Sequence, residues 1–240
     1  MRLSDHSTLT FDCYGTLIDW ETGIFSALAP WLDRAGVSTT RDQVLEAFAQ
    51  TESAQQAATP AMCYPELLTR VHAGLAQRFG IAPDPVAAQT FGASIKDWPA
   101  FPDSADALAY LRQHFKLVIL SNVDRASFAH SNARLGVTFD AIYTAEDIGS
   151  YKPDPRNFSY LLSHLAERGI TKAEILHTAE SLFHDHIPAK QAGLATCWIH
   201  RRAGKTGHGA TRVPDTDVLP DFHFESMAAL ADAHRAEIGG

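Results

Sequence analysis

Four polar positions in this sequence have residue types that can do chemistry, and each lies where we expect a strand of a parallel sheet to end. Asp12 follows TLTF, Ser121 and Asn122 follow LVIL, Lys152 lies in GSYKPDP, and Asp185 ends HTAESLFHD. Open parallel sheets bind ligands beyond the carboxyl ends of their strands. An aspartate carboxylate is nucleophilic at neutral pH, and a nearby lysine keeps it ionised. The set predicts a nucleophilic Asp12 with Lys152 as its partner.

Each of these positions also has an ordinary explanation when it is taken alone. Asp and Ser-Asn cap helices, Lys-Pro-Asp-Pro forms a turn, and an acidic residue before a helix stabilises the helix dipole. Taken singly, each ordinary explanation would be the better one, so the argument for a site depends on the four positions together and on their order.

Alternating apolar runs and amphipathic stretches predict the α/β architecture that would position these residues. We expect a Rossmann-like parallel sheet that is covered by helices on both faces. The expected strands are 8–11, 117–120, 141–144, 175–178, 196–199 and 222–224. The expected core helices are 105–113, 125–135, 156–168, 188–192 and 226–238.

The alternation breaks after the first strand, where every pattern up to the second strand is helical. Thr40 caps a helix that we expect over residues 41–54, and Gly80 ends the helix that follows. We therefore expect residues 20–98 to form a helical cap that is inserted, on two hinges, into a core of residues 1–19 and 99–240. The alternative is one α/β domain with a long crossover.

In this order the four positions resemble the motifs of the haloacid dehalogenase superfamily, whose hydrolases carry a nucleophilic Asp, a Ser or Thr, a Lys and a final acidic motif. The resemblance spans residues 8–201. The run FDCYGTLIDW is its most specific part and is similar to the L-2-haloacid dehalogenase branch. The resemblance implies that the chain cleaves the carbon–halogen bond of a small 2-haloacid through an ester on Asp12.

The same resemblance implies a role for each matching residue. Thr16 would support the loop of the nucleophile. Ser121 and Asn122 would hold the substrate carboxylate or the oxygens of the nucleophile. Lys152 would orient the nucleophile and keep it ionised, and Asp185 would position or activate the hydrolytic water.

Tyr14 stands where phosphatases of this superfamily usually carry a second Asp, which protonates the departing alkoxide. A halide leaves as a stable anion and needs no proton, so Tyr14 at the substrate suits carbon–halogen cleavage. The ordinary explanation is that Tyr14 packs against the cap.

Glu180 favours a different reaction. Glu180 and Asp185 are spaced like the acidic pair of Mg²⁺-dependent phosphatases, and together with Asp12 and the Tyr14 carbonyl they would suit a hard cation. Leu182 stands in the triplet where dehalogenases carry polar residues, and it cannot hold a water molecule. A Mg²⁺-dependent phosphatase of a small metabolite is therefore the alternative, and a non-catalytic binding protein on the same fold is a second one. We nevertheless expect chemistry without a metal, in which Glu180 supports the substrate site from behind the residues that touch the substrate.

Other charged residues have roles that the sequence leaves open. His184 and His186 flank Asp185, and we favour a helix-entry pair over a zinc pair, with His184 as a candidate orienting group or base. Arg201 and Arg202 are interpreted as a solvated strand end, the alternative being a clamp for phosphate or carboxylate. The candidates for the cap arginine that dehalogenases use for halide are Arg34, Arg41, Arg70 and Arg78.

The composition limits the partners. Lys and Arg total 20 against 28 Asp and Glu, a formal charge of -8 that argues against nucleic acid. No apolar run approaches the roughly 18 residues of a membrane span, and the N-terminus does not resemble a signal peptide. Three cysteines without CxxC spacing fit a reducing cytoplasm. We expect a cytoplasmic enzyme with a small anionic substrate and no cofactor or metal, and we leave a homodimer open.

Overall fold

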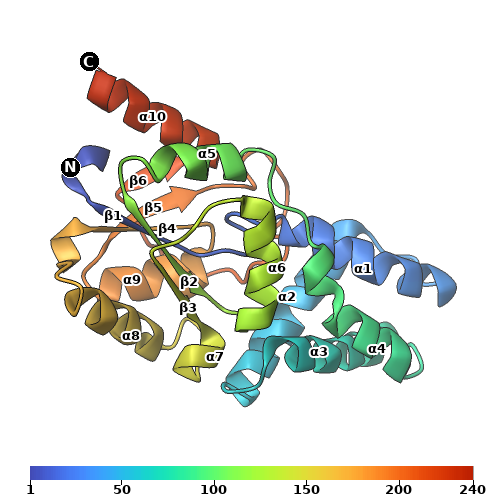
Figure 1. The fold of residues 1–240 in the computed structure, drawn as a ribbon. Coiled ribbons are helices and arrows are strands. Elements are labelled where there is room, and N and C mark those ends of the chain that lie inside the picture. Colours follow the sequence, from blue (N-terminus) through green and yellow to red (C-terminus); the bar gives the residue numbers. More distant parts are fainter. Residues whose placement is uncertain (240) are drawn as a thin grey trace.

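The computed structural model describes residues 1–239 of the chain, and within them six parallel strands form one sheet (Figure 1). The strand order is β3-β2-β1-β4-β5-β6. All six lie within a residue of the strands predicted from sequence, so the predicted α/β class is confirmed. Their bounds are β1 Thr8–Phe11, β2 Lys116–Ser121, β3 Ala141–Thr144, β4 Ile175–Ala179, β5 Ala195–Ile199 and β6 Phe222–Phe224.

Helices cover both faces of the sheet, because successive strand residues point to opposite sides. In β2, Leu117 and Ile119 pack with α5, α6 and α10, whereas Val118 and Leu120 pack with α8 and α9. Both faces are therefore apolar, as a buried parallel sheet requires. The helices of the core are α5 Ser104–Leu111, α6 Arg125–Leu135, α7 Ala145–Ile148, α8 Pro155–Ala166, α9 Ile187–Gln191 and α10 Met227–Gly239.

The segment between β1 and β2 is helical, as its patterning predicted. Thr40 and Gln43 form a capping box at the start of α2, and Gly80, with a φ of 69°, ends α3. In Figure 1 these helices lie to one side of the core, beyond the carboxyl ends of the strands. We call them the cap helices; they are α1 Trp20–Arg34, α2 Arg41–Ala58, α3 Tyr64–Phe79 and α4 Pro85–Gly92, followed by the 3-10 turn Ser94–Asp97.

The chain leaves the core and returns to it through two short segments that pair with each other. The Asp19 N–H donates to the Pro99 carbonyl at 2.8 Å, and the Phe101 N–H donates to the Leu17 carbonyl at 3.0 Å. Between these bonds, Ile18 and Ala100 form an antiparallel bridge. The two ends of the helical segment are thus fixed side by side, directly after the loop that carries Asp12.

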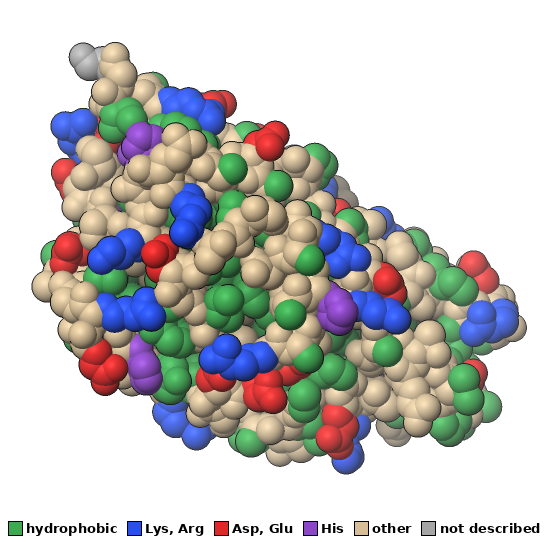
Figure 2. Space-filling view, viewed as in Figure 1, with side chains coloured by type: hydrophobic (Ala, Val, Ile, Leu, Met, Phe, Trp, Pro, Cys, Tyr) green, Lys and Arg blue, Asp and Glu red, His purple; other side chains and the backbone are tan. Residues whose placement is uncertain are grey.

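Lys or Arg and Asp or Glu side chains are interspersed on the face drawn in Figure 2. Over residues 1–239, no helix combines the length and the apolar character that crossing a bilayer would require.

We predict that Gly23→Ala destabilises the protein. A Cβ at Gly23 would lie 2.3 Å from Cγ of Trp98, the buried residue at the return of the chain. Alanine normally favours a helix by roughly 0.5–1 kcal/mol over glycine, but overpacking a core costs about 1–3 kcal/mol. Urea denaturation should therefore show a lower free energy of unfolding. The control is Ser26→Ala, on the exposed face of the same helix, and an unchanged midpoint for Gly23→Ala would contradict the prediction.

Candidate active site

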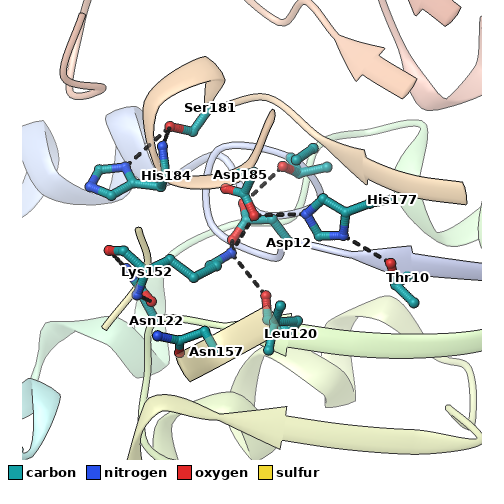
Figure 3. A network of polar contacts seen from close by, with 12 residues as sticks. Thr10, Asp12, Leu120, Asn122, Lys152, Asn157, His177, Ser181, His184 and Asp185 are labelled. Carbon is teal, nitrogen blue, oxygen red and sulfur yellow. Dashed lines mark hydrogen bonds and ion pairs between the residues drawn. The ribbon is translucent and has the colours of Figure 1, made fainter. Parts of the chain in front are cut away.

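Three of the predicted residues, Asp12, Lys152 and Asp185, meet at the carboxyl edge of the sheet (Figure 3). The Lys152 ammonium donates to Oδ1 of Asp12 at 2.9 Å and to Oδ1 of Asp185 at 2.6 Å. Asp12 directly follows β1, and Asp185 lies in a π-helical turn after β4, the strand that pairs with β1. The pairing of the two strands therefore places both carboxylates on one ammonium.

Lys152 is buried, with only 1% of its side chain exposed, and all three of its N–H groups have acceptors. The third acceptor is the Leu120 carbonyl, at 2.9 Å. Burial acts to lower the pKa of Lys152, but the charges of Asp12 and Asp185 raise it above its ordinary value. The side chain therefore stays an ammonium at neutral pH.

The two carboxylates respond differently to this ammonium. Burial raises the pKa of Asp12, and the Lys152 ammonium and the Thr16 hydroxyl oppose that rise. Burial also acts to raise the pKa of Asp185, but Lys152 and His177 outweigh it and hold this pKa well below its usual range. Asp185 is therefore a permanent anion and a weak base.

His177 is a site residue that the sequence reasoning missed. Its Nε2 lies 2.9 Å from Oδ1 of Asp185, and its Nδ1 lies 2.8 Å from the Thr10 hydroxyl (Figure 3). Because an ionised carboxylate only accepts hydrogen bonds, Nε2 must carry a proton. The available signal was a histidine within a strand that is otherwise expected to be buried, in register with Thr10 of β1.

Asn122 holds the backbone of Lys152. Its amide NH₂ donates to the Lys152 carbonyl at 3.0 Å, and its amide oxygen accepts from the Lys152 N–H at 2.7 Å. Both polar groups of the side chain are thus engaged, although Asn122 also lines the cavity described below. The neighbouring Ser121 hydroxyl is buried and has no hydrogen-bond partner within residues 1–239.

Thr16 links the nucleophile loop to the loop after β4. Its hydroxyl donates to Oδ2 of Asp12 at 2.8 Å and accepts from the Glu180 N–H at 2.9 Å. The Glu180 carboxyl itself accepts from the Thr211 hydroxyl and does not line the cavity. Burial raises the pKa of Glu180 to about 8. This carboxyl is therefore mostly neutral at neutral pH, and it is the backbone N–H of Glu180, through the Thr16 hydroxyl, that links this residue to Asp12.

A cavity of about 30 Å³ separates these residues from the cap helices. On the core side it is lined by Asp12, Tyr14, Asn122, Lys152, Ser181, His184 and Asp185, and on the cap side by Trp20, Glu52, Gln56 and Tyr64. The Tyr14 hydroxyl is turned to Ser131 at 2.9 Å, and its ring packs edge-on against Trp98. Both explanations offered for Tyr14 thus apply in part, because it lines the cavity and packs against the return of the cap segment.

Comparison with known proteins identifies the family. The family described as haloacid dehalogenase-like hydrolase matches residues 6–193 of the 240. This chain belongs to the haloacid dehalogenase-like hydrolases. The resemblance seen in the motifs is therefore confirmed at the level of the family.

Individual relatives of this hydrolase differ in activity. The (S)-2-haloacid dehalogenase of Pseudomonas putida is 32% identical over 109 residues, which are 43% of this chain and only 45% of that protein. Pyrimidine 5'-nucleotidase YjjG of Escherichia coli is 25% identical over 140 residues, 57% of this chain and 61% of that protein. The L-2-haloacid dehalogenase of Xanthobacter autotrophicus with chloropropionic acid covalently bound superposes with a TM-score of 0.76 at 20% identity, over 96% of this chain and 98% of that one.

None of the four candidate halide arginines of this hydrolase lines the cavity. Arg34 is exposed, and Arg41 donates to the Thr22 hydroxyl. Arg70 pairs with Glu66 on the surface, and Arg78 donates to a glutamine side chain. The cap side of the cavity therefore carries no arginine.

The interpretation of Arg201 and Arg202 as a solvated strand end is wrong, because both guanidinium groups are largely buried in ion pairs. Arg201 contacts Asp103 at 2.8 Å and donates to the Thr16 carbonyl at 3.0 Å. Arg202 contacts Glu21 of α1 at 2.6 Å. Arg201 therefore supports the nucleophile loop, and Arg202 joins the cap helices to the core.

His184 and His186 do not form a metal pair. His186 is fully buried, and its Nε2 lies 2.9 Å from the Ala179 carbonyl. The Nδ1 of His184 lies 3.1 Å from the Ser181 hydroxyl, and burial lowers the pKa of His184 to about 4. Over residues 1–239, His, Cys, Asp and Glu side chains do not gather in a group of three that could hold a metal ion.

The residues present also do not fit the Mg²⁺ site that the phosphatase alternative requires. That site was expected to combine Asp12 and the Tyr14 carbonyl with Glu180 and Asp185. The Glu180 carboxyl is turned to Thr211, so the acidic pair does not form. Oδ1 of Asp12 and Oδ1 of Asp185 are shared by one ammonium, and within residues 1–239 these two carboxylates are not joined by a third acidic, His or Cys side chain that would complete a group able to hold a cation.

We predict that Lys152→Met shifts the acid side of the activity profile to higher pH. Burial raises the pKa of Asp12, and the Lys152 ammonium is the main group that opposes this rise. Without the ammonium the pKa of Asp12 rises further, so Asp12 becomes protonated at a higher pH as the pH falls. The rate should fall roughly 10²-fold, since a preorganised charge is removed. The measurement is kcat/KM against pH, with the exposed Lys116→Met as control and circular dichroism to verify folding. An unmoved acid limb in a folded variant would refute the role of Lys152.

Proposed function

We propose that this hydrolase cleaves the carbon–halogen bond of a small 2-haloacid through a covalent ester on Asp12. The family supplies the hydrolytic chemistry, and the choice of bond rests on the charges around the cavity. With Asp12 ionised, as an attacking carboxylate must be, Asp12 and Asp185 bring two negative charges to the cavity, and Lys152 is the one cationic side chain among the residues that line it.

This charge balance is the observation that carries the proposal. A phosphoryl group spreads charge over several oxygens in the transition state and normally needs a metal ion and cationic side chains to neutralise it. A small monoanion with a halide leaving group demands less, because only one unit of charge moves and the halide is stable without a proton. Tyr14 at the position of the phosphatase acid supports the same choice, since its hydroxyl is bonded to Ser131.

In the first step, an oxygen of the Asp12 carboxylate attacks the carbon that bears the halogen. A carbon–oxygen bond forms as the carbon–halogen bond breaks, and the halide takes the bonding electrons. Lys152 and Thr16 hold the carboxylate in place during the attack. We assign the substrate carboxylate to the pair Ser121 and Asn122: the Ser121 hydroxyl is unpartnered but does not line the cavity, whereas Asn122 does line it.

In the second step, water attacks the carbonyl carbon of the Asp12 ester. The products are the 2-hydroxyacid, the regenerated carboxylate and one proton. Oδ2 of Asp185 has no hydrogen-bond partner within residues 1–239, so we assign it to orient this water. Asp185 is too weak a base to remove the proton fully before attack.

The proposed reaction predicts halide release that does not depend on a metal. Purified protein should release halide from racemic 2-chloropropionate at the same rate with EDTA as without it. The parallel assay measures phosphate released from p-nitrophenyl phosphate. If activity on either substrate disappears with EDTA and returns with Mg²⁺, the phosphatase alternative replaces the proposal.

Covalent catalysis predicts that Asp12→Asn reduces turnover by roughly 10³-fold or more, because the amide cannot form the ester. The surface variant Asp106→Asn should leave the rate unchanged. In a single turnover in ¹⁸O-labelled water, mass spectrometry should find the label in the Asp12 carboxylate and not in the hydroxyacid. Label in the product of the first turnover would exclude the ester.

A further inference from the structure

The cap side of the cavity carries a buried carboxyl, Glu52, which the site described so far does not use. It lies on α2, and only 3% of the residue is exposed. Its Oε1 accepts from the Gln56 amide at 2.6 Å and from the Tyr64 hydroxyl at 3.1 Å. Its Oε2 has no hydrogen-bond partner within residues 1–239, and Glu52 lines the same cavity as Asp12.

The hydrogen bonds of Glu52 show where a proton on this carboxyl would lie. Both neighbouring donors, from Gln56 and Tyr64, point at Oε1, so Oε1 is the acceptor oxygen. A proton on the neutral acid therefore belongs on Oε2, the oxygen that is left to the cavity. In that form Glu52 presents an O–H donor to whatever occupies the cavity.

The neutral form is the one that burial favours. Burial raises the pKa of Glu52 to about 7, although the Tyr64 hydroxyl acts to lower it. An anionic substrate beside two further carboxylates would disfavour ionisation of Glu52 more strongly. Glu52 is therefore protonated on the acid side of neutrality and ionised on the alkaline side.

The direction of displacement places the halide against the cap. When an oxygen of Asp12 attacks a tetrahedral carbon, the leaving group departs from the opposite side of that carbon. Residues of the cap helices, Glu52 among them, close the same cavity that Asp12 lines from the core. No arginine lies among them, so a neutral donor is what the chain offers to the departing charge.

We propose that the Oε2–H of Glu52 donates a hydrogen bond to the departing halide, with Gln56 and Tyr64 holding the carboxyl in place. This inference rests on the proposed dehalogenation and names the group that stabilises its leaving group. The carbon–halogen electron pair leaves with the halide. Glu52 keeps its proton throughout, because a halide is a weaker base than a carboxylate.

Titration of the other groups near Glu52 would not produce the same loss of activity above neutral pH. The tyrosines have pKa values raised by burial, and His184 has a pKa lowered to about 4. Asp185 and the Lys152 ammonium keep their charges. The pKa of Asp12 is raised by burial, but ionisation of Asp12 increases activity as the pH rises and so cannot produce an alkaline limb. Arg212 stacks on Phe183 and does not line this cavity. The titratable or charged groups concerned are Tyr14, Tyr64, Tyr151, His184, Asp12, Asp185, Lys152 and Arg212.

The test compares the pH dependence of kcat in the native enzyme and in Glu52→Gln. The native enzyme should lose activity as the pH rises above about 7, because the ionised carboxyl has no proton to donate and the bound anion raises the pKa of Glu52 further. In Glu52→Gln, an amide N–H replaces the O–H at every pH. This variant should have a kcat roughly threefold lower at acid pH, since the donor is weaker, and no alkaline limb near neutrality. An alkaline limb at the native position in Glu52→Gln would overturn the proposal.

Two further variants separate a catalytic role from a structural one. Glu52→Leu removes the donor and should lower kcat about tenfold or more for chloride as leaving group. Tyr64→Phe removes a bond that favours the ionised carboxyl, so the alkaline limb should move to higher pH. The exposed Glu66→Gln on α3 is the matched control and should keep the native profile. An alkaline limb that stays in place in Tyr64→Phe would count against Glu52.

A measurement of bromide binding tests the role of Glu52 separately from the proposed hydrolysis of haloacids. Bromide titrated by calorimetry into the native protein should bind roughly tenfold more tightly at about pH 6 than at about pH 8.5, because only the protonated carboxyl donates. Binding to Glu52→Gln should not change between these values. If no haloacid is hydrolysed but bromide binding shows this dependence, the proposed reaction fails and the anion site stands. If haloacids are hydrolysed while bromide binding is independent of pH, the inference on Glu52 fails alone.

Discussion

The buried ammonium of Lys152 is the interaction on which the site depends. Burying a lone charge is costly, and two carboxylates that share a dry site repel each other. Here the ammonium donates one hydrogen bond each to Asp12, Asp185 and the Leu120 carbonyl. Every N–H is therefore satisfied, and the positive charge favours the ionised form of both acids. Removing one partner from such a buried cluster typically costs about 3–5 kcal/mol. The Asn122 amide fixes the Lys152 backbone. It therefore stabilises the fold and also holds Lys152 in position beside the nucleophile Asp12.

Much of this arrangement could be predicted from sequence because it follows from strand ends. A parallel sheet brings the carboxyl ends of its strands to one edge, so polar residues after β1, β2 and β4 had to become neighbours. The caps at Thr40 and Gly80 are local signals of a few residues, and they located the starts and ends of helices well. The helix that begins after Thr40 nevertheless continues to Ala58, four residues beyond its expected end, because nothing in that stretch stops it.

The rest depends on contacts between distant segments, which periodicity does not encode. Arg201 and Arg202 have the composition of a solvated strand end, and only folding brings them to Asp103 and Glu21. Glu180 has the spacing of a metal ligand, but a hydroxyl more than thirty residues away turns its carboxyl aside. Glu52 gave no signal at all, since a single glutamate on an amphipathic helix is usually solvated. Its burial depends on how α2 docks over the sheet.

The paired segments at Ile18 and Ala100 have a consequence for how such a protein can change over generations. For the core, the whole stretch from α1 to the 3-10 turn is a loop whose two ends are held in adjacent positions. The entropy of closing a loop grows only slowly with its length, by about 0.6 kcal/mol for each doubling. The core can therefore carry inserts of very different size at nearly the same cost in stability. The helices from α1 to the 3-10 turn could therefore be exchanged between related proteins if the segments at Ile18 and Ala100 are kept. The core should still fold, while the new helices would change which molecules reach the nucleophile.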